Sequence, residues 1–200
     1  MATVPKGVDP RVKRTRQLLQ QAFLGLLQEK GFSHISIQDI TERATVNRGT
    51  FYAHFADKLA LMDSIVRDQF HQVIASKLPA KAGWDKRSLG LLIQAAEEYI
   101  EEMHAHCGPP GEMEPLFERT VQEELAQVLV DWLKRASAAG DRWPVPVETI
   151  ALVASWGIFG AAVEWSQGAK TLSAERMAND VLLVISEGVM RLNPGTVPDE

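Results

Sequence analysis

Helix start and stop signals near residue 40 constrain the fold of this chain most strongly. Ser36 and Asp39 have the spacing of a capping box, in which each residue satisfies a free backbone amide of the other. Ile35 and Ile40 flank them with the spacing of a hydrophobic staple. We therefore expect a helix that starts at Ser36 and ends at about Ala44.

A second short helix follows almost at once. Asn47 can cap a helix over residues 48–55, and Asp57 can cap another that starts at Lys58. The span between Ala44 and Asn47 has room only for a sharp turn. Two short helices joined by a turn of about 3–4 residues describe a helix-turn-helix.

An N-terminal helix completes a three-helix unit. Apolar residues recur at helical spacing from Val12 to Leu27, and Gly31 can end the helix. This helix can pack against apolar side chains of the helix-turn-helix: Ile37, Ile40, Ala44, Val46, Phe51 and Phe55. We assign residues 1–57 to one domain and residues 58–200 to a second.

The rest of the chain also favours helices. Helical spacing predicts them over 58–78, 88–106, 112–118, 119–138, 147–168 and 174–191, with breaks at 108–111 and 141–146. No segment shows convincing strand alternation. The prediction is an all-α fold of about nine helices.

Composition excludes several classes of protein. Of the 200 residues, 46% are hydrophobic, which is enough for a core, and the single cysteine excludes a disulfide scaffold. No signal peptide is visible, and the apolar run 149–163 is shorter than the ~20 residues that span a bilayer. We therefore expect a cytoplasmic protein with no membrane partner, in which 149–163 is a helix buried on most faces.

Charge is unevenly divided along the chain. The first 60 residues hold nine Lys or Arg and five Asp or Glu, whereas the other 140 hold twelve and twenty-one. A basic N-terminal part suggests a polyanionic partner, although a chance fluctuation of a solvated surface explains the numbers equally well. The basic cluster at 11–16 can likewise be a solvated helix start or an arm on a DNA backbone.

Side chains at the start of the 48–55 helix suit duplex DNA. Arg48 can bind guanine and Asn47 can bind adenine in the major groove. Gly49 allows close approach of the backbone, and Thr50 can contact a thymine methyl or a phosphate. Phosphate contacts can come from Tyr52, His54, Lys58 and the helix start at Ser36.

These residues resemble the TetR family of transcriptional regulators. The resemblance covers about residues 11–60 and is most specific at Phe51-Tyr52-Ala53-His54-Phe55, which is followed by Asp57-Lys58. It implies an all-α homodimer that binds a palindromic operator in double-stranded DNA. It further implies a repressor that a small-molecule effector of unknown identity releases from DNA.

The C-terminal domain holds a candidate dimer interface. Small residues in 149–163 permit close approach of another helix. The helices at 149–163 and 174–191, paired with their copies in a second subunit, can form a four-helix contact. The candidate interface residues are Ala154, Gly157, Gly160, Ala161, Val181 and Ile185. The alternative is that both helices complete the core of one subunit.

A candidate effector pocket is defined by aromatic and soft side chains, which at helical spacing are more often plain core: Phe70, Met103, Phe117, Trp132, Trp156 and Phe159. We expect no cofactor and no metal, since the cluster His104, His106 and Cys107 matches no zinc spacing. Catalytic motifs are absent, so an enzyme is not expected. A C-terminal domain that binds a protein partner instead of a small ligand remains the alternative.

Overall fold

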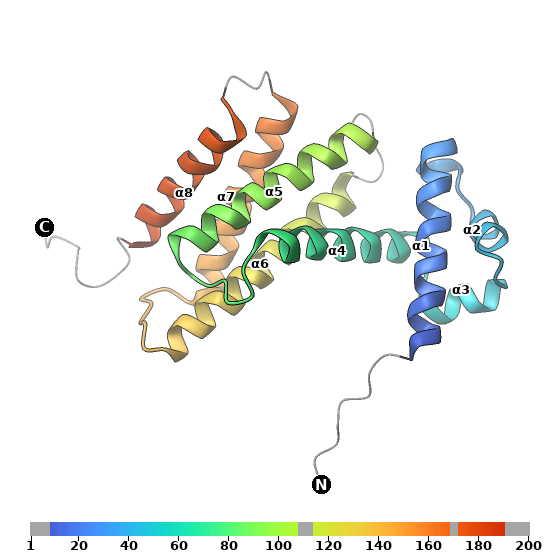
Figure 1. Ribbon diagram of the computed structural model, residues 1–200, viewed down its shortest axis with the longest axis horizontal. Helices are drawn as coiled ribbons and strands as arrows, with labels where there is room; N and C mark the ends of the chain where they lie inside the picture. Colours follow the sequence, from blue (N-terminus) through green and yellow to red (C-terminus); the bar gives the residue numbers. More distant parts are fainter. Residues whose placement is uncertain (1–8, 108–113, 169–171, 191–200) are drawn as a thin grey trace, which may run out of the picture. The chain divides into compact units, whose positions relative to one another are not determined.

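The computed structural model describes residues 9–107, 114–168 and 172–190, apart from the side chains of 105–107, 114 and 189–190. These residues form helices and no strand, so the predicted all-α fold is confirmed (Figure 1). The elements are α1 (Pro10–Lys30), a 3-10 turn η1 (Phe32–His34), α2 (Ile37–Ala44), α3 (Arg48–His54), α4 (Lys58–Lys77), α5 (Lys86–Cys107), α6 (Glu114–Ala138), α7 (Val147–Gln167) and α8 (Ala174–Met190).

The chain divides into two compact units. Unit 1 is Met1–Ile65 with Gly111–Leu116, and unit 2 is Val66–Pro110 with Phe117–Glu200. Each has its own buried apolar residues, as expected of parts that fold around separate cores.

The core of unit 1 forms where α1 meets the two short helices. Leu19 and Phe23 of α1, Ile40 of α2 and Phe51 of α3 are fully buried. Gly31 ends α1 with φ 73°, a left-handed value that favours glycine, as the sequence predicts. The three-helix unit therefore forms around residues that the periodicity had placed inside.

The segment 114–138 differs from the prediction. Two helices were expected over 112–118 and 119–138, but the structure has one continuous helix, α6. Pro115 lies in its first turn, where a missing N–H costs nothing. Phe117, Val121 and Leu125, four residues apart, are all buried and continue one apolar stripe. The described part of the chain thus contains eight α-helices rather than nine.

Unit 2 is a bundle in which α5, α7 and α8 pack against one another. Polar contacts between buried residues join the other helices to them. The Tyr99 hydroxyl donates to the Val66 carbonyl at 3.2 Å, and Gln122 Nε2 donates to Ser155 Oγ at 3.1 Å. The first contact joins α5 to α4, and the second joins α6 to α7.

Helix α7 is buried on one face, so the expectation that most of its faces are covered is wrong for a single chain. Ala151, Ile158 and Ala162 are buried, whereas Leu152 and Val153 are 50% and 68% exposed. By length and composition α7 meets the criterion for a membrane-spanning helix, which core helices of soluble proteins also meet.

Candidate nucleic-acid interface

The start of α2 has the predicted capping box. Ser36 Oγ accepts from the Asp39 amide at 3.1 Å, and Asp39 Oδ2 accepts from the Ser36 amide at 2.7 Å. Lys30 lies 2.8 Å from the same carboxylate, and its hydrogen bond, followed by those from Ser36, holds the pKa of Asp39 far below its usual value. Ser36 is exposed, but its hydroxyl and amide are both engaged by Asp39.

The turn between α2 and α3 depends on a left-handed residue. Thr45 has φ 55°, the one positive value at a non-glycine residue in the described part of the chain. Its amide donates to the Glu42 carbonyl at 3.1 Å, and the Val46 amide donates to Thr41 at 3.0 Å. These bonds close α2 and redirect the backbone within three residues.

The start of α3 is capped by Asn47, as predicted. Asn47 Oδ1 accepts from the Thr50 amide at 2.7 Å and from Thr50 Oγ1 at 3.0 Å. A Cβ atom at Gly49 would lie 3.2 Å from the same oxygen, closer than an ordinary contact. Glycine therefore leaves room for the cap while keeping the helix start open to solvent.

The outer face of α3 presents polar side chains, and the phenylalanine rings on its inner face are buried. Phe51 and Phe55 are buried, as predicted, whereas Arg48, Gly49 and Tyr52 are exposed. Arg48 Nη2 donates to the Tyr52 hydroxyl at 3.2 Å, and its guanidinium carbon lies 5.6 Å from the centre of that ring. Tyr52 thus orients Arg48 along the exposed face.

Lys58 is more constrained than the sequence indicates. Its ammonium donates to the carbonyls of Phe32 and Ile35 at 2.9 and 3.0 Å and lies 4.1 Å from the centre of the Phe32 ring. An ammonium has three donors, so one is left for a phosphate. His54 and Thr50 are half-buried, and the His54 ring lies 6.4 Å from that of Phe55.

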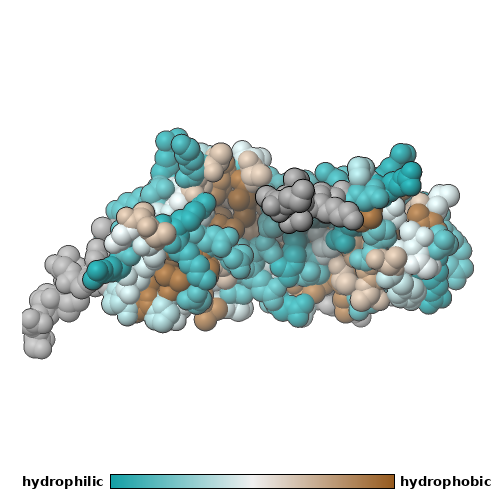
Figure 2. All heavy atoms as spheres, turned by 90° about the horizontal axis from the view of Figure 1, so that it is seen from below, coloured by the Kyte–Doolittle hydropathy of each residue, from teal (hydrophilic) through white to brown (hydrophobic). Residues whose placement is uncertain are grey.

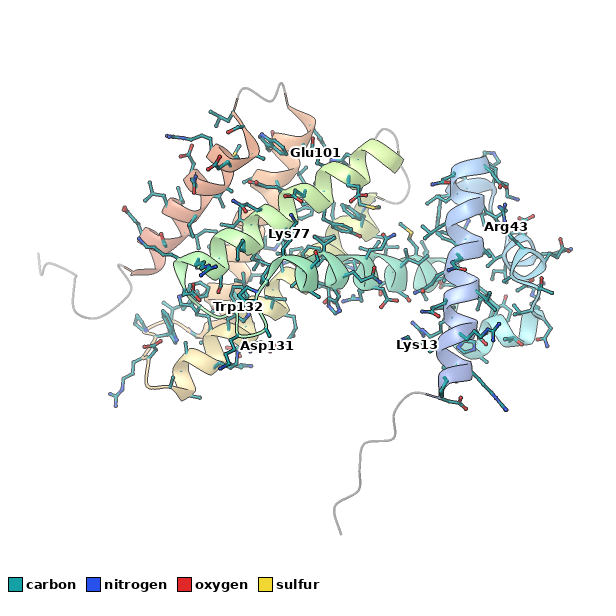
Figure 3. All side chains as sticks on the ribbon, viewed as in Figure 1. Lys13, Arg43, Lys77, Glu101, Asp131 and Trp132 are labelled. Carbon is teal, nitrogen blue, oxygen red and sulfur yellow. The ribbon has the colours of Figure 1, made fainter. Side chains whose placement is uncertain are left out.

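The basic cluster at the start of α1 separates into two groups. Arg11, Lys13 and Arg14 are exposed, and Figure 3 labels Lys13 on this helix. Arg16 instead lies 4.6 Å from the centre of the Phe55 ring, and its Nη2 donates to Ser64 Oγ at 3.0 Å. Three of the four basic side chains are therefore available to a polyanion, and the fourth packs on the core.

The six candidate pocket residues do not form one site. The rings of Phe70 and Phe117 each contact Tyr99, at centroid distances of 5.3 and 5.8 Å. Phe159 is also buried, and Met103 is half-buried. Trp156 is 51% exposed on the outer face of α7, which places it outside any interior pocket.

Trp132 instead lines an open hollow of about 480 Å³ near the C-terminal end of α4. Asp131 and Trp132 adjoin one another there on α6 (Figure 3). The remaining lining residues are mostly apolar, with Arg135 as the second charge: Ile74, Ala75, Leu78, Pro79, Ala80, Ala82, Val128 and Arg135.

The candidate dimer residues lie at different depths. Ala154 and Ile185 are buried within the subunit, Gly160, Ala161 and Val181 are half-buried, and Gly157 is exposed. Small-residue reasoning missed the large side chains on the outer faces of the same helices: Leu152, Val153, Trp156, Leu183 and Val184, each at least 50% exposed. Their helical spacing on α7, three and four residues apart, was the available signal.

An ionic network on α4 and α6 also escaped the sequence analysis. Arg67 donates to Glu123 at 2.6 Å and to Glu124, and His71 contacts the second oxygen of Glu124. Glu124 is buried, so losing these partners would leave a buried carboxyl group without hydrogen bonds. These contacts join residues of α4 to residues of α6 that lie 53 to 57 positions further along the chain, which no local pattern indicates.

No group of three or more His, Cys, Asp and Glu side chains is placed to hold a metal ion among the described residues. His104 Nδ1 lies 2.7 Å from Ser166 Oγ, a contact that needs no metal. The side chains of His106 and Cys107 lie outside the described residues.

The geometry of unit 1 defines a class of protein. A helix-turn-helix held on a third helix, with an exposed arginine near the start of its second short helix, is a DNA-binding domain of the major-groove type. Residues 21–65 match the family model for bacterial regulatory proteins of the tetR family. The helix-turn-helix part of this chain is thus of the TetR-family type, as the sequence predicted.

Individual relatives agree with this assignment. Over 70 residues the chain is 41% identical to the uncharacterized HTH-type transcriptional regulator YxbF of Bacillus subtilis (strain 168), a match that covers 34% of this chain and 18% of YxbF. Over 123 residues it is 29% identical to the HTH-type transcriptional repressor DhaR of Mycobacterium sp. (strain GP1), covering 60% of this chain and 62% of DhaR. The chain thus spans less than two thirds of either relative.

A solved structure extends the likeness in fold to most of the chain. The transcriptional regulator FadR from Bacillus subtilis, in complex with stearoyl-CoA, superposes with a TM-score of 0.54 at 16% identity. The match covers 86% of this chain and 98% of FadR. At this identity the comparison shows a shared fold.

Proposed function

We propose that this protein is a dimeric repressor that binds a palindromic DNA operator and that a small-molecule effector releases. The observation that carries the proposal is the exposed tip of α3, where Arg48 lies against Tyr52 above a fully buried Phe51. Recognition of a nucleobase in the major groove needs a forked hydrogen-bond donor that is held on a rigid, packed support. Residues 1–57 are the proposed DNA-binding domain, and residues 58–200 the dimerisation and effector domain.

Within that tip, Asn47, Arg48, Gly49 and Thr50 are the proposed base-reading residues. The Asn47 oxygen is engaged as a cap, so its NH₂ group is the part that can bind a base. Tyr52, His54, Ser36 and Lys58 are the proposed phosphate contacts. At Ser36 the backbone amides of the first turn of α2 are the donors, since Asp39 engages the side chain.

The test is to select the preferred duplex from a random pool and measure binding of Arg48→Ala to that duplex and to single-base variants. We expect a loss of about 1–3 kcal/mol that is concentrated at one base position. Arg142→Ala, an exposed arginine of unit 2, is the matched control and should bind normally. Equal weakening on every duplex would contradict base recognition by Arg48.

The outer faces of α7 and α8 support the homodimer. Val153 and Val184 are 68% and 73% exposed, and large apolar side chains gathered on neighbouring helices call for a partner surface. On the face drawn in Figure 2, hydrophobic residues lie in separate patches among hydrophilic ones. A two-fold dimer would supply the pair of α3 helices that a palindromic operator requires, with half-sites ~34–36 Å apart.

Two features support an effector in the C-terminal domain. FadR, which shares the fold, was solved with stearoyl-CoA. In this chain, the α4–α6 network and the hollow beside Trp132 both involve α4, the helix that continues from unit 1 into unit 2. An effector that moved α4 would weaken DNA binding, and DNA would weaken effector binding by the same factor.

The alternative is a protein partner in place of a small ligand. The exposed apolar face of α7 is the feature that favours it. Sedimentation of the purified protein separates the two: a stable dimer covers this face, whereas a monomer leaves it free for another protein. A cytoplasmic location and the absence of enzymatic activity belong to the same proposal.

A further inference from the structure

Glu97 in the middle of α5 is the least satisfied polar group that the structure describes. Its side chain is 1% exposed, and neither carboxyl oxygen has a hydrogen-bond partner. Burying a carboxyl group without a partner is costly, and each such group calls for an explanation. Leucine or methionine at this position would fill the same space without that cost.

The helical register shows which neighbours Glu97 faces. Gly90 and His104 lie seven residues before and after it, almost on the same face of α5. A Cβ atom at Gly90 would lie 3.5 Å from Leu182 of α8, and His104 contacts Ser166 of α7. Glu97, halfway between them, therefore faces the region where α7 and α8 pack on α5.

Among the described side chains, none of opposite charge acts on this carboxyl. The buried residues of α7 are apolar or small, with one hydroxyl: Ile150, Ala151, Ala154, Ser155, Ile158, Phe159, Ala162 and Trp165. Those of α8 among the described side chains are Ala178, Ile185 and Ser186. Burial, followed by the charge of Glu98, raises the pKa of Glu97 to about 7.

We infer that Glu97 binds the protonated amino group of a small organic amine whose apolar part lies among α5, α7 and α8. This inference rests on the proposed effector domain and names the chemical class of the effector. Two unpartnered oxygens need hydrogen-bond donors, and an ammonium supplies donors and charge together. Charge-assisted bonds of this kind are roughly twice as strong as neutral ones.

Other ligands fit less well. A quaternary ammonium has the charge but no N–H donor, and an alcohol has a donor but no charge. An anion would meet a like charge. A metal ion would need further ligands, and no group of three suitable side chains occurs in the described parts of the chain.

The experiment uses the full chain without DNA, at pH 8. Butylamine, hexylamine and benzylamine are titrated by calorimetry beside the alcohols of the same shape and benzyltrimethylammonium. We expect at least one amine to bind about tenfold or more tightly than its alcohol, since one such bond contributes about 1.4 kcal/mol or more. The quaternary ion should bind no better than the alcohols.

Two variants complete the experiment. Glu97→Gln keeps the size of the side chain, and the preference for the amine should disappear in it. Glu98→Gln changes the neighbouring carboxylate, which pairs with Lys77 at 2.5 Å, and should keep the preference. Far-ultraviolet circular dichroism of both variants confirms that each is folded.

Failure of this inference is distinct from failure of the proposed function. If no amine is preferred by the wild-type protein, or if the preference survives in Glu97→Gln, the inference is wrong. A protein that binds the amine through Glu97 but binds no DNA would contradict the proposed repressor and leave the amine site standing. Release of DNA by the same amine, in the wild type and not in Glu97→Gln, would support both.

Discussion

Asn47 Oδ1 accepts two hydrogen bonds from Thr50, one from the amide at 2.7 Å and one from the hydroxyl at 3.0 Å. The residue that the sequence assigns to adenine recognition is thus also the residue that starts α3. Stability and recognition are therefore linked at one side chain.

The two roles of Asn47 can be separated by substitution. Asn47→Ala should lower the free energy of unfolding by about 1 kcal/mol, the usual effect of losing an N-cap. Asn47→Asp keeps the acceptor and the stability, but it places an anion beside DNA and should abolish binding. Urea denaturation and binding to the selected duplex measure the two effects, and equal stability of all three proteins would contradict the capping role.

Lys58 should contribute to both folding and DNA affinity. Lys58→Met removes two hydrogen bonds from a charged donor to Phe32 and Ile35, so we expect a loss of about 1–3 kcal/mol in the free energy of unfolding. Binding to every duplex should weaken alike, and the salt slope should fall by about one unit. Lys13→Met, at an exposed position of α1, should leave stability unchanged. An unchanged salt slope in Lys58→Met would remove Lys58 from the phosphate contacts.

Gly157 is a specific probe of the dimer. A Cβ atom there would meet no atom of the same chain within 4 Å, so Gly157→Leu should fold normally. In a close contact between copies of α7 the added side chain would clash, and the dimer dissociation constant should rise by about tenfold or more. Analytical ultracentrifugation measures this change, with Ala138→Leu at an exposed position of α6 as the control. If both variants dimerise like the wild type, α7 does not meet α7 at Gly157.

Glu124 should be important for the stability of unit 2. Glu124→Ala deprives Arg67 and His71 of a buried acceptor, and we expect a loss of about 1–3 kcal/mol in the free energy of unfolding. Glu123→Ala, which removes the half-exposed partner of Arg67, should cost less than about 1 kcal/mol. Urea denaturation compares the two, and similar losses would show that burial does not distinguish them.

Glu97 gives stability a pH dependence of definite sign. Its pKa rises from 4.5 to about 7 on folding, so between these values the folded chain binds more protons than the unfolded chain. The contribution of Glu97 to the free energy of unfolding therefore falls as pH rises through this range and stays low above about pH 7. Glu97→Gln has no carboxyl group to titrate at this position. The free energy of unfolding of this variant, relative to that of the wild type, should therefore increase between pH 5 and pH 8. A constant difference in urea denaturation across that range would show that Glu97 does not titrate.

The short elements of unit 1 were predictable because their determinants are local. The Ser36–Asp39 capping box, the Asn47 cap and Gly31 after α1 each act within about four residues. The same local reasoning divided α6 in two, although no helix-breaking residue occurs near residue 118.

What the sequence by itself determined is the order of the helices and the exposed, basic start of α3, since capping and periodicity are read along one stretch of chain. Tertiary structure alone decided that Trp156 faces outward, that Lys58 reaches back to Phe32, and that Glu97 is buried with no partner. The physical reason is that burial depends on which helices pack together, and contacts between residues far apart in sequence leave no periodic signal in either segment.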